Sequence, residues 1–133
     1  MGLWSEQEVE FLRHNESLLN KKDYDEFYIK AYSELGSDIS HRLMLGLFLV
    51  SPEPEFELIL EVEKDSTSPK IINYELYLRS PRMPGSIQIC SSRMSGNPDD
   101  FSILGQCKIA LRWLKFDEST IRKILNRVKV KRV

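Results

Sequence analysis

Histidine and cysteine are scarce in this sequence of 133 residues, with two of each, and that scarcity excludes several kinds of chemistry. His14 and His41 lie far apart, and neither belongs to an H-x-x-x-H or Cys/His cluster, so the sequence offers no zinc-type ligand set. Cys90 and Cys107 are too widely spaced for a C-x-x-C redox or metal element. We therefore expect neither a metal site nor a cofactor.

Glycine-rich loops and nucleophile motifs are also missing. Gly85, Gly96 and Gly105 are isolated, so neither a Walker-type loop nor a dinucleotide-binding turn is present. There is no G-x-S-x-G elbow, and Cys107 falls on the predicted buried side of a helix, where a thiol stays protonated and inert. We therefore predict that the protein is not an enzyme and has no catalytic residues. A small hydrolase built on a row of glutamates is the distant alternative.

Long hydrophobic runs are lacking too. The longest apolar run without a charge is the eight residues 43–50, whereas a helix that crosses a bilayer needs about 20. The opening residues MGLWSEQE have neither a basic leader nor an apolar core, so we expect no secretory signal. In such a chain the two cysteines are expected to be reduced and buried. These features predict an intracellular protein, cytoplasmic or nuclear, with no membrane span.

What the sequence does contain is the composition of an ordinary globular protein. It is 41% hydrophobic and 29% charged, which is too apolar for a disordered chain and too charged for a membrane protein. The length predicts one globular domain over residues 1–133. Within that domain, residues 129–133 alternate as KVKRV and are predicted to form either a basic tail or an edge strand.

Two helices are predicted at the start of the chain. Ser5 and Glu8 have the spacing of a capping box, which predicts a first helix from about residue 5 to residues 20–22. Asp23 and Glu26 repeat that arrangement before a second helix, which Gly36 ends. Apolar side chains recur through residues 24–35 at helical spacing and form one wide face.

Four strands are predicted next. The run RLMLGLFLV at residues 42–50 fits a strand buried on both faces, although its pattern leaves a short buried helix open. Residues 55–63 and 70–79 alternate between apolar and polar side chains, and residues 86–94 offer a weaker strand. The side chains predicted to face the core are Phe56, Leu58, Leu60, Val62, Ile72, Tyr74, Leu76 and Leu78.

Two more helices are predicted after the strands. Asp99 or Asp100 caps a helix that runs to about residue 116 and is apolar on nearly every side, so we expect it to lie between other elements. Asp117 or Ser119 caps a final helix. The fold class predicted is therefore α+β, with two N-terminal helices, a four-stranded antiparallel meander and two C-terminal helices packed on one sheet face.

Charge is divided unequally along the chain. Residues 1–75 hold 16 acidic and 7 basic side chains, whereas residues 76–133 hold 4 acidic and 12 basic ones. The acidic candidates share one predicted strand face, where Tyr77 is an exposed aromatic that suits an interface anchor. They are Glu55, Glu57, Glu61, Glu63 and Glu75. Three interpretations remain open for this face: ordinary solvation, protein binding and catalysis.

The basic candidates lie on the two C-terminal helices and the tail. They are Lys108, Arg112, Lys115, Arg122, Lys123, Arg127, Lys129, Lys131 and Arg132. Clustered cations bind phosphate backbones with an affinity that depends on salt, and they also attract acidic proteins. A solvated helix face with a tail, an acidic protein partner and a nucleic acid are the three interpretations of this cluster.

Together these features predict a non-enzymatic protein-interaction domain, such as an adaptor, accessory or regulatory subunit, that binds a macromolecular partner through charged surfaces. The alternative is a nucleic-acid-binding protein that uses the basic C-terminal helices and tail. A homo-oligomer, paired head to tail between acidic and basic surfaces, also remains open. All of these depend on the acidic and basic regions staying apart in the folded chain.

Overall fold

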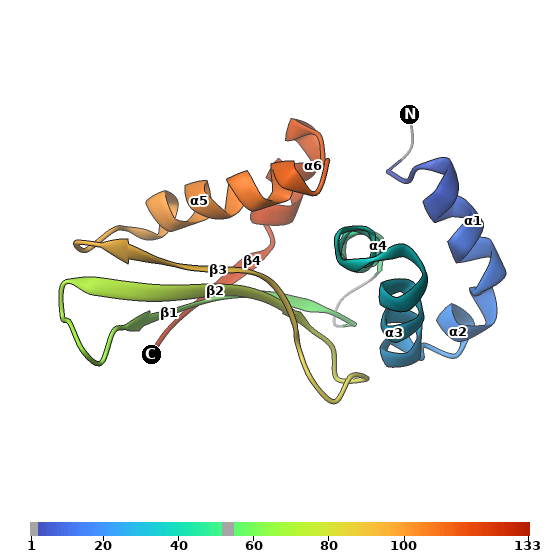
Figure 1. Ribbon diagram of the computed structural model, residues 1–133, viewed down its shortest axis with the longest axis horizontal. Coiled ribbons are helices and arrows are strands. Elements are labelled where there is room, and N and C mark those ends of the chain that lie inside the picture. The colour runs from blue at the N-terminus through green and yellow to red at the C-terminus, as the bar shows by residue number, and fades with distance from the viewer. Residues whose placement is uncertain (1–2, 52–54) are drawn as a thin grey trace. The chain divides into compact units, whose positions relative to one another are not determined.

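The computed structural model describes residues 3–51 and 55–133 (Figure 1). The chain divides into two compact units: the first takes in the chain up to Phe56 together with Ser80–Gly85, and the second takes in Glu57–Arg79 with Ser86–Val133. The single domain predicted for residues 1–133 stays a prediction. No helix in the two described ranges is long and apolar enough to cross a bilayer.

The first unit begins with two short helices, α1 (Glu6–His14) and α2 (Glu16–Asn20), where the sequence predicts one. The capping box at Ser5 and Glu8 is confirmed. The break falls at Asn15, whose side-chain amide donates a hydrogen bond to the Phe11 carbonyl at 2.8 Å. A buried Asn that bonds to the backbone in this way competes with the helical ladder, which explains the interruption.

Helix α3 (Tyr24–Leu35) forms where the sequence predicts it. Its first turn is capped by the Asp23 carboxylate, which accepts a hydrogen bond from the Glu26 amide at 3.3 Å. Gly36 follows with φ of 91°, a left-handed conformation that favours glycine and ends the helix. The buried face is narrower than predicted, because Tyr32 is 52% exposed.

Helix α4 (Ser37–Val50) occupies the segment for which a strand is predicted, so that prediction is wrong. The polar residues before the apolar run form its first turn, where the Ser40 hydroxyl donates a hydrogen bond to the Ser37 carbonyl at 2.8 Å. Leu and Met are good helix formers, and the run contains one β-branched residue, Val50. His41, which directly precedes that run, belongs to the same helix.

The second unit contains a four-stranded sheet and two helices. In chain order these are β1 (Glu57–Lys64), β2 (Ile71–Arg79), β3 (Ile87–Ser95), α5 (Asp100–Trp113), α6 (Glu118–Leu125) and β4 (Val128–Arg132). The strand order is β3-β2-β1-β4. Strands β1, β2 and β3 are antiparallel, whereas β4 is parallel to β1.

The sheet is therefore mixed. The predicted four-stranded antiparallel meander is right for β1, β2 and β3, but its first strand, residues 42–50, is helix α4, and the fourth strand of the sheet is β4, which is parallel to β1. The chain leaves β3 through two helices before it returns beside β1, and a crossover of this kind delivers a parallel strand. The fourth strand comes from the basic residues at 128–132, so the edge-strand interpretation of 129–133 holds and the tail interpretation does not.

One face of this sheet is covered by α5 and α6, as Figure 1 shows. The predicted alternation is confirmed on β1 and β2, where Leu58, Leu60, Val62, Ile72, Tyr74, Leu76 and Leu78 are all buried. Helix α5 contributes Ile103, Cys107 and Leu111 to the same core. The side of α5 that faces away from the sheet is exposed, since Trp113 is 77% exposed. The prediction that α5 lies between other elements is therefore wrong.

Candidate functional site

The acidic candidates that lie in strands share the sheet face opposite α5 and α6. Glu57, Glu61 and Glu63 alternate with buried residues on β1, and Glu75 and Tyr77 do so on β2. In the antiparallel pairing Glu61 lies directly opposite Glu75. Tyr77, which the sequence predicts to be exposed, is half-buried on this face.

Glu55 does not belong to that face, which corrects its predicted place. It precedes β1 and lies in the first unit. Its carboxylate accepts hydrogen bonds from Lys22 at 2.8 Å and from Arg82 at 3.1 Å. These bonds, that of Lys22 foremost, lower the pKa of the Glu55 carboxyl. Glu55 therefore forms ion pairs with two cations of its own unit.

Strand β4 brings cations to the acidic face. The Lys129 ammonium lies 3.5 Å from a Glu57 carboxylate oxygen, and Arg79 lies 3.6 Å from the same oxygen. The Lys131 ammonium lies 3.7 Å from Glu61. This follows from the parallel register of β4 and β1, which places Lys131 beside Glu61. The expectation that the acidic and basic regions stay apart is therefore wrong for this sheet, and only basic candidates that lie off the sheet, on α5 and α6, are separate from the acidic face.

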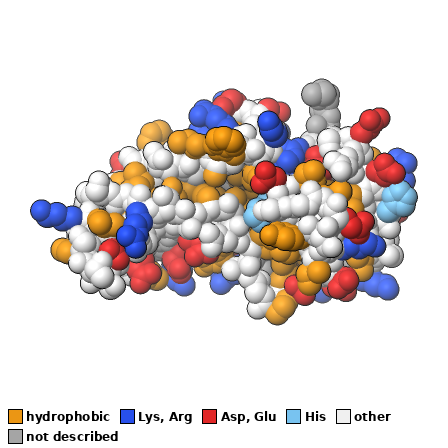
Figure 2. Space-filling view, in the orientation of Figure 1, with side chains coloured by type: hydrophobic (Ala, Val, Ile, Leu, Met, Phe, Trp, Pro, Cys, Tyr) orange, Lys and Arg blue, Asp and Glu red, His pale blue; other side chains and the backbone are white. Residues whose placement is uncertain are grey.

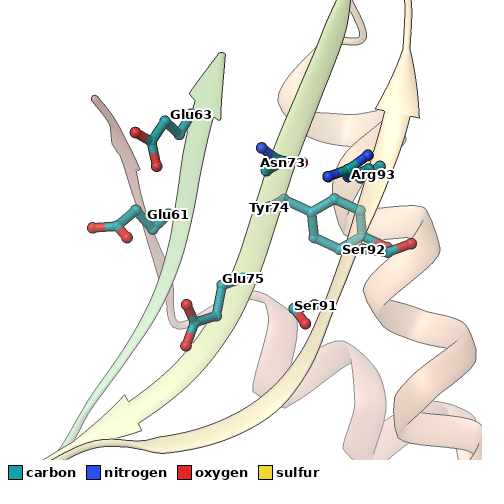
Figure 3. Close-up of a pocket in the computed structure, with 8 residues that line it drawn as sticks. All are labelled: Glu61, Glu63, Asn73, Tyr74, Glu75, Ser91, Ser92 and Arg93. Carbon is teal, nitrogen blue, oxygen red and sulfur yellow. The ribbon is translucent and has the colours of Figure 1, made fainter. Parts of the chain in front are cut away.

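A shallow hollow of about 310 Å³ lies on the same face (Figure 3). Its lining residues are Glu61, Glu63, Asn73, Tyr74, Glu75, Ser91, Ser92 and Arg93. The three carboxylates project side by side and do not converge on a common point, as Figure 3 shows. Within residues 3–51 and 55–133 no group of three or more His, Cys, Asp or Glu side chains is arranged to hold a metal ion. The hollow is a polar surface feature.

The basic candidates on α5 are partly neutralised by one carboxylate. Glu118, in the first turn of α6, lies 3.2 Å from the Lys108 ammonium and 2.7 Å from the Arg112 guanidinium. The hydrogen bond raises the pKa of Arg112 and lowers the pKa of Glu118. Two cations therefore share a single negative charge, which leaves an excess of positive charge between the helices.

Three basic candidates have no ion pair with any other described residue: Lys115, Arg122 and Lys123. All three are exposed. Arg132 at the end of β4 pairs with Asp100 at 2.6 Å, and the half-buried Arg127 makes contacts of its own. Among the basic candidates, the cations without an ion pair therefore lie on α6 and the turn before it, where the Asp117 carboxylate is attracted to Lys123.

Exposed apolar side chains lie on α5 beside these cations. Phe101 is 85% exposed and Trp113 is 77% exposed, with Ile109 at 45% between them. The sequence pattern missed Phe101, although it lies two residues, and so about 200° around the helix, from the buried Ile103. That angle is the signal that would have placed Phe101 away from the sheet.

A second hollow, of about 270 Å³, lies between α5 and α6. We call it the α5–α6 groove and define it by its lining residues: Phe101, Leu104, Gly105, Lys108, Ile121, Arg122, Leu125 and Asn126. Two of the basic candidates, Lys108 and Arg122, line it together with apolar side chains, and no carboxylate does. The α5–α6 groove therefore combines positive charge with solvent-exposed apolar surface.

The thiols and imidazoles do not assemble a nucleophilic site. Cys107 on α5 is buried, and its hydrogen bond to Cys90 on β3 lowers the pKa of Cys90 and raises that of Cys107. Both thiols are free. His41 lies 3.2 Å from the Tyr28 hydroxyl, and His14 bonds to the backbone of its own helix.

Known proteins give no guide to this surface, because no protein-family model, no curated protein and no solved structure matches the chain. Its function therefore has to be inferred from the residues themselves. On the acidic sheet face three cations lie against Glu57 and Glu61, whereas on α5 and α6 a single carboxylate, that of Glu118, is shared by two cations.

Proposed function

We propose that this chain is a non-enzymatic protein-interaction domain, an adaptor, accessory or regulatory subunit, that binds an acidic partner protein through α5 and α6. The observation that carries the proposal is the set of exposed cations Lys115, Arg122 and Lys123, which no described carboxylate pairs with, beside exposed aromatic side chains. Charge of one sign steers a partner into contact, and buried aromatic and Arg side chains supply most of the binding energy.

The acidic sheet face is the weaker candidate for recruitment. Lys129, Lys131 and Arg79 already lie within 4 Å of its carboxylates, so a basic partner would have to displace them. Glu63 and Glu75 keep their charge without an ion pair to another described residue, but two carboxylates on a solvated sheet face are ordinary.

Nucleic acid is the second candidate, because Phe101 and Trp113 are exposed aromatics on which bases would stack beside cations. Acidic residues interrupt the same surface, however: Glu118 holds two of its cations and Asp100 holds Arg132. A phosphate backbone requires a track of uncompensated cations, and few remain here. A protein with separate acidic and apolar contacts fits this surface better. The intracellular location, cytoplasmic or nuclear, is part of the same proposal.

The test compares two charge-reversed variants with the native protein as immobilised baits in a nuclease-treated cell extract at about 150 mM salt. The first variant carries Lys115→Glu, Arg122→Glu and Lys123→Glu. The control carries Lys64→Glu, Lys70→Glu and Arg93→Glu, which change the charge by the same amount elsewhere in the second unit. Circular dichroism confirms that both fold.

We expect quantitative mass spectrometry to find a defined protein on the native bait and on the control, and to find it depleted from the first variant. Equal recovery on all three baits would contradict the proposal. Two results would favour nucleic acid instead: recovery of the protein only from a parallel extract left without nuclease, or a gel shift with mixed DNA and RNA that is lost between about 50 and 200 mM salt.

A further inference from the structure

The α5–α6 groove has a shape as well as a charge. Ile121 is fully buried at its base, Leu104 and Leu125 are half-buried along it, and Phe101 stands out at 85% exposure. Figure 2 shows hydrophobic side chains next to Lys and Arg side chains over these two helices. An aromatic ring left in water beside a hollow is available to pack against a partner's apolar side chain.

The groove is open because α5 has a glycine where a side chain would stand. A Cβ added at Gly105 would meet no atom within 4 Å. Phe101, Gly105 and Ile109 are spaced four residues apart, so the glycine leaves a gap between two exposed apolar side chains on one side of the helix. At about 270 Å³ the hollow is smaller than the roughly 300–1,000 Å³ typical of small-molecule sites, and it suits apolar side chains of a peptide.

The charged side chains of the groove indicate the chemistry of the peptide that would bind there. Lys108 shares the Glu118 carboxylate with Arg112, and Arg122 has no ion pair among the described residues. The groove therefore attracts carboxylates at its edges while its interior is apolar. An amphipathic helix seated in an apolar groove between two helices is a common mode of peptide recognition, with anchors spaced three or four residues apart.

We propose that the α5–α6 groove binds an acidic amphipathic helix of a partner protein, with the apolar side of that helix against Phe101 and over Gly105 and its carboxylates against Arg122 and Lys108. This inference rests on the proposed function, since it names the element of the partner that α5 and α6 contact. The apolar contacts supply the affinity, and the cations select the acidic sequence over others.

The sharpest variant is Gly105→Leu, which fills the groove. A Cβ at Gly105 meets no atom within 4 Å, and replacing a glycine in a helix interior favours the helix, so we expect this variant to keep or raise the thermal midpoint. Two pairs of variants have matched controls. Phe101→Ala is compared with Tyr32→Ala, an exposed aromatic of α3, and Arg122→Glu is compared with Lys70→Glu, an exposed cation that does not line the groove.

The probe is a fluorescein-labelled model peptide with leucines at i, i+3 or i+4 and i+7 and glutamates on its flanks, together with the same peptide carrying lysines in place of glutamates. Fluorescence anisotropy measures both. We expect the acidic peptide to bind the native protein and the lysine peptide not to bind. Gly105→Leu, Phe101→Ala and Arg122→Glu each weaken binding at least about tenfold, or 1.4 kcal/mol, and the two controls stay within about twofold.

Three results would overturn the inference: no binding of the acidic peptide at about 1 mM, equal binding of the lysine peptide, or native affinity in a folded Gly105→Leu protein. Light scattering that shows a native dimer abolished by Gly105→Leu would also overturn it, because a second copy would then be the occupant. The capture assay distinguishes failure of the groove proposal from failure of the proposed function. If the charge-reversed bait loses its partner and Gly105→Leu keeps it, the proposed function stands and the groove is wrong; if neither loses it, both fail.

Discussion

The ion pair between Glu8 and Arg42 allows a specific test of what stabilises the first unit. Glu8 is 2% exposed and closes the capping box with Ser5, whose amide donates to it at 3.0 Å. The same carboxylate lies 3.2 Å and 3.3 Å from two guanidinium nitrogens of Arg42 on α4. Arg42 also donates to the Leu3 carbonyl at 3.1 Å. One carboxylate therefore serves a helix cap and a buried ion pair that joins α1 to α4.

The two roles separate by mutation. Glutamine serves at this position of a capping box as well as glutamate does, so Glu8→Gln keeps the cap and removes the charge opposite Arg42. Breaking a buried pair while the partner charge remains costs about 3–5 kcal/mol of unfolding free energy. Ser5→Ala instead removes the cap and should cost about 1 kcal/mol. We therefore expect Glu8→Gln to be the more damaging of the two by at least about 2 kcal/mol.

The protein has two tryptophans, one in each unit, which provides the assay. Because Trp113 is 77% exposed, Trp113→Phe should leave stability unchanged, and the fluorescence of Trp4 then reports on the first unit alone. Urea unfolding of the variants in this background, followed by fluorescence and by circular dichroism, yields each free-energy difference. The double variant Glu8→Gln/Arg42→Met should lose less stability than the sum of its parts, since no charge remains unpaired.

Equal losses of about 1 kcal/mol for Glu8→Gln and Ser5→Ala would refute this reasoning. Glu8 would then act as a cap only, and its contact with Arg42 would be energetically neutral. Additive losses in the double variant would lead to the same conclusion.

Three other predictions concern single residues. Gly46→Ala should destabilise the first unit by about 1–3 kcal/mol in urea unfolding, because the added Cβ would overlap the Trp4 ring, and unchanged stability would show that the ring moves freely. Lys115→Gly should stabilise the second unit by about 1 kcal/mol in thermal unfolding, since Lys115 holds φ of 69° after α5, where glycine has no Cβ penalty. Burial lowers the pKa of His41 below its usual 6.5, so the unfolded chain takes up its proton at a higher pH than the folded one. The free energy of unfolding therefore has its full value above about pH 6.5 and decreases as the pH falls toward the pKa of His41 in the folded protein. In urea titrations from pH 7.5 to 5, His41→Asn should remove the part of this decrease that His41 causes.

Local signals in the sequence predict much of this fold. The capping box at Ser5, the cap at Asp23, the stop at Gly36 and the alternation through β1 and β2 are each set by neighbouring residues, and the structure confirms them. The error at residues 42–50 has a physical cause: a run that is apolar on every side buries equally well as a strand or as a helix. Its richness in Leu and Met was the signal that favoured a helix.

Long-range pairing is what the sequence could not reveal. Leu58 pairs with Val128, and nothing local to either segment specifies that partner or its parallel direction. The same limit applies to the candidate site. The charge pattern identified the cations of α5 and α6, but which of them a carboxylate neutralises depends on where Glu118 lies in space. The exposure of Phe101 likewise depends on which side of α5 faces the sheet.

The pairing of β1 with β4 also changes what the unequal charge distribution means. Glutamates from the acidic part of the sequence and lysines from the basic part belong to the same unit, and Lys129 and Lys131 stand against Glu57 and Glu61. Part of the asymmetry is therefore an internal sheet contact and leaves no charge for a partner. Deleting residues 129–133, the obvious test of a basic tail, would strip the edge strand from β1 and expose the hydrogen-bonding groups of that strand. Loss of binding after such a deletion would report on the stability of the sheet, and only the substitutions on α5 and α6 would report on recognition.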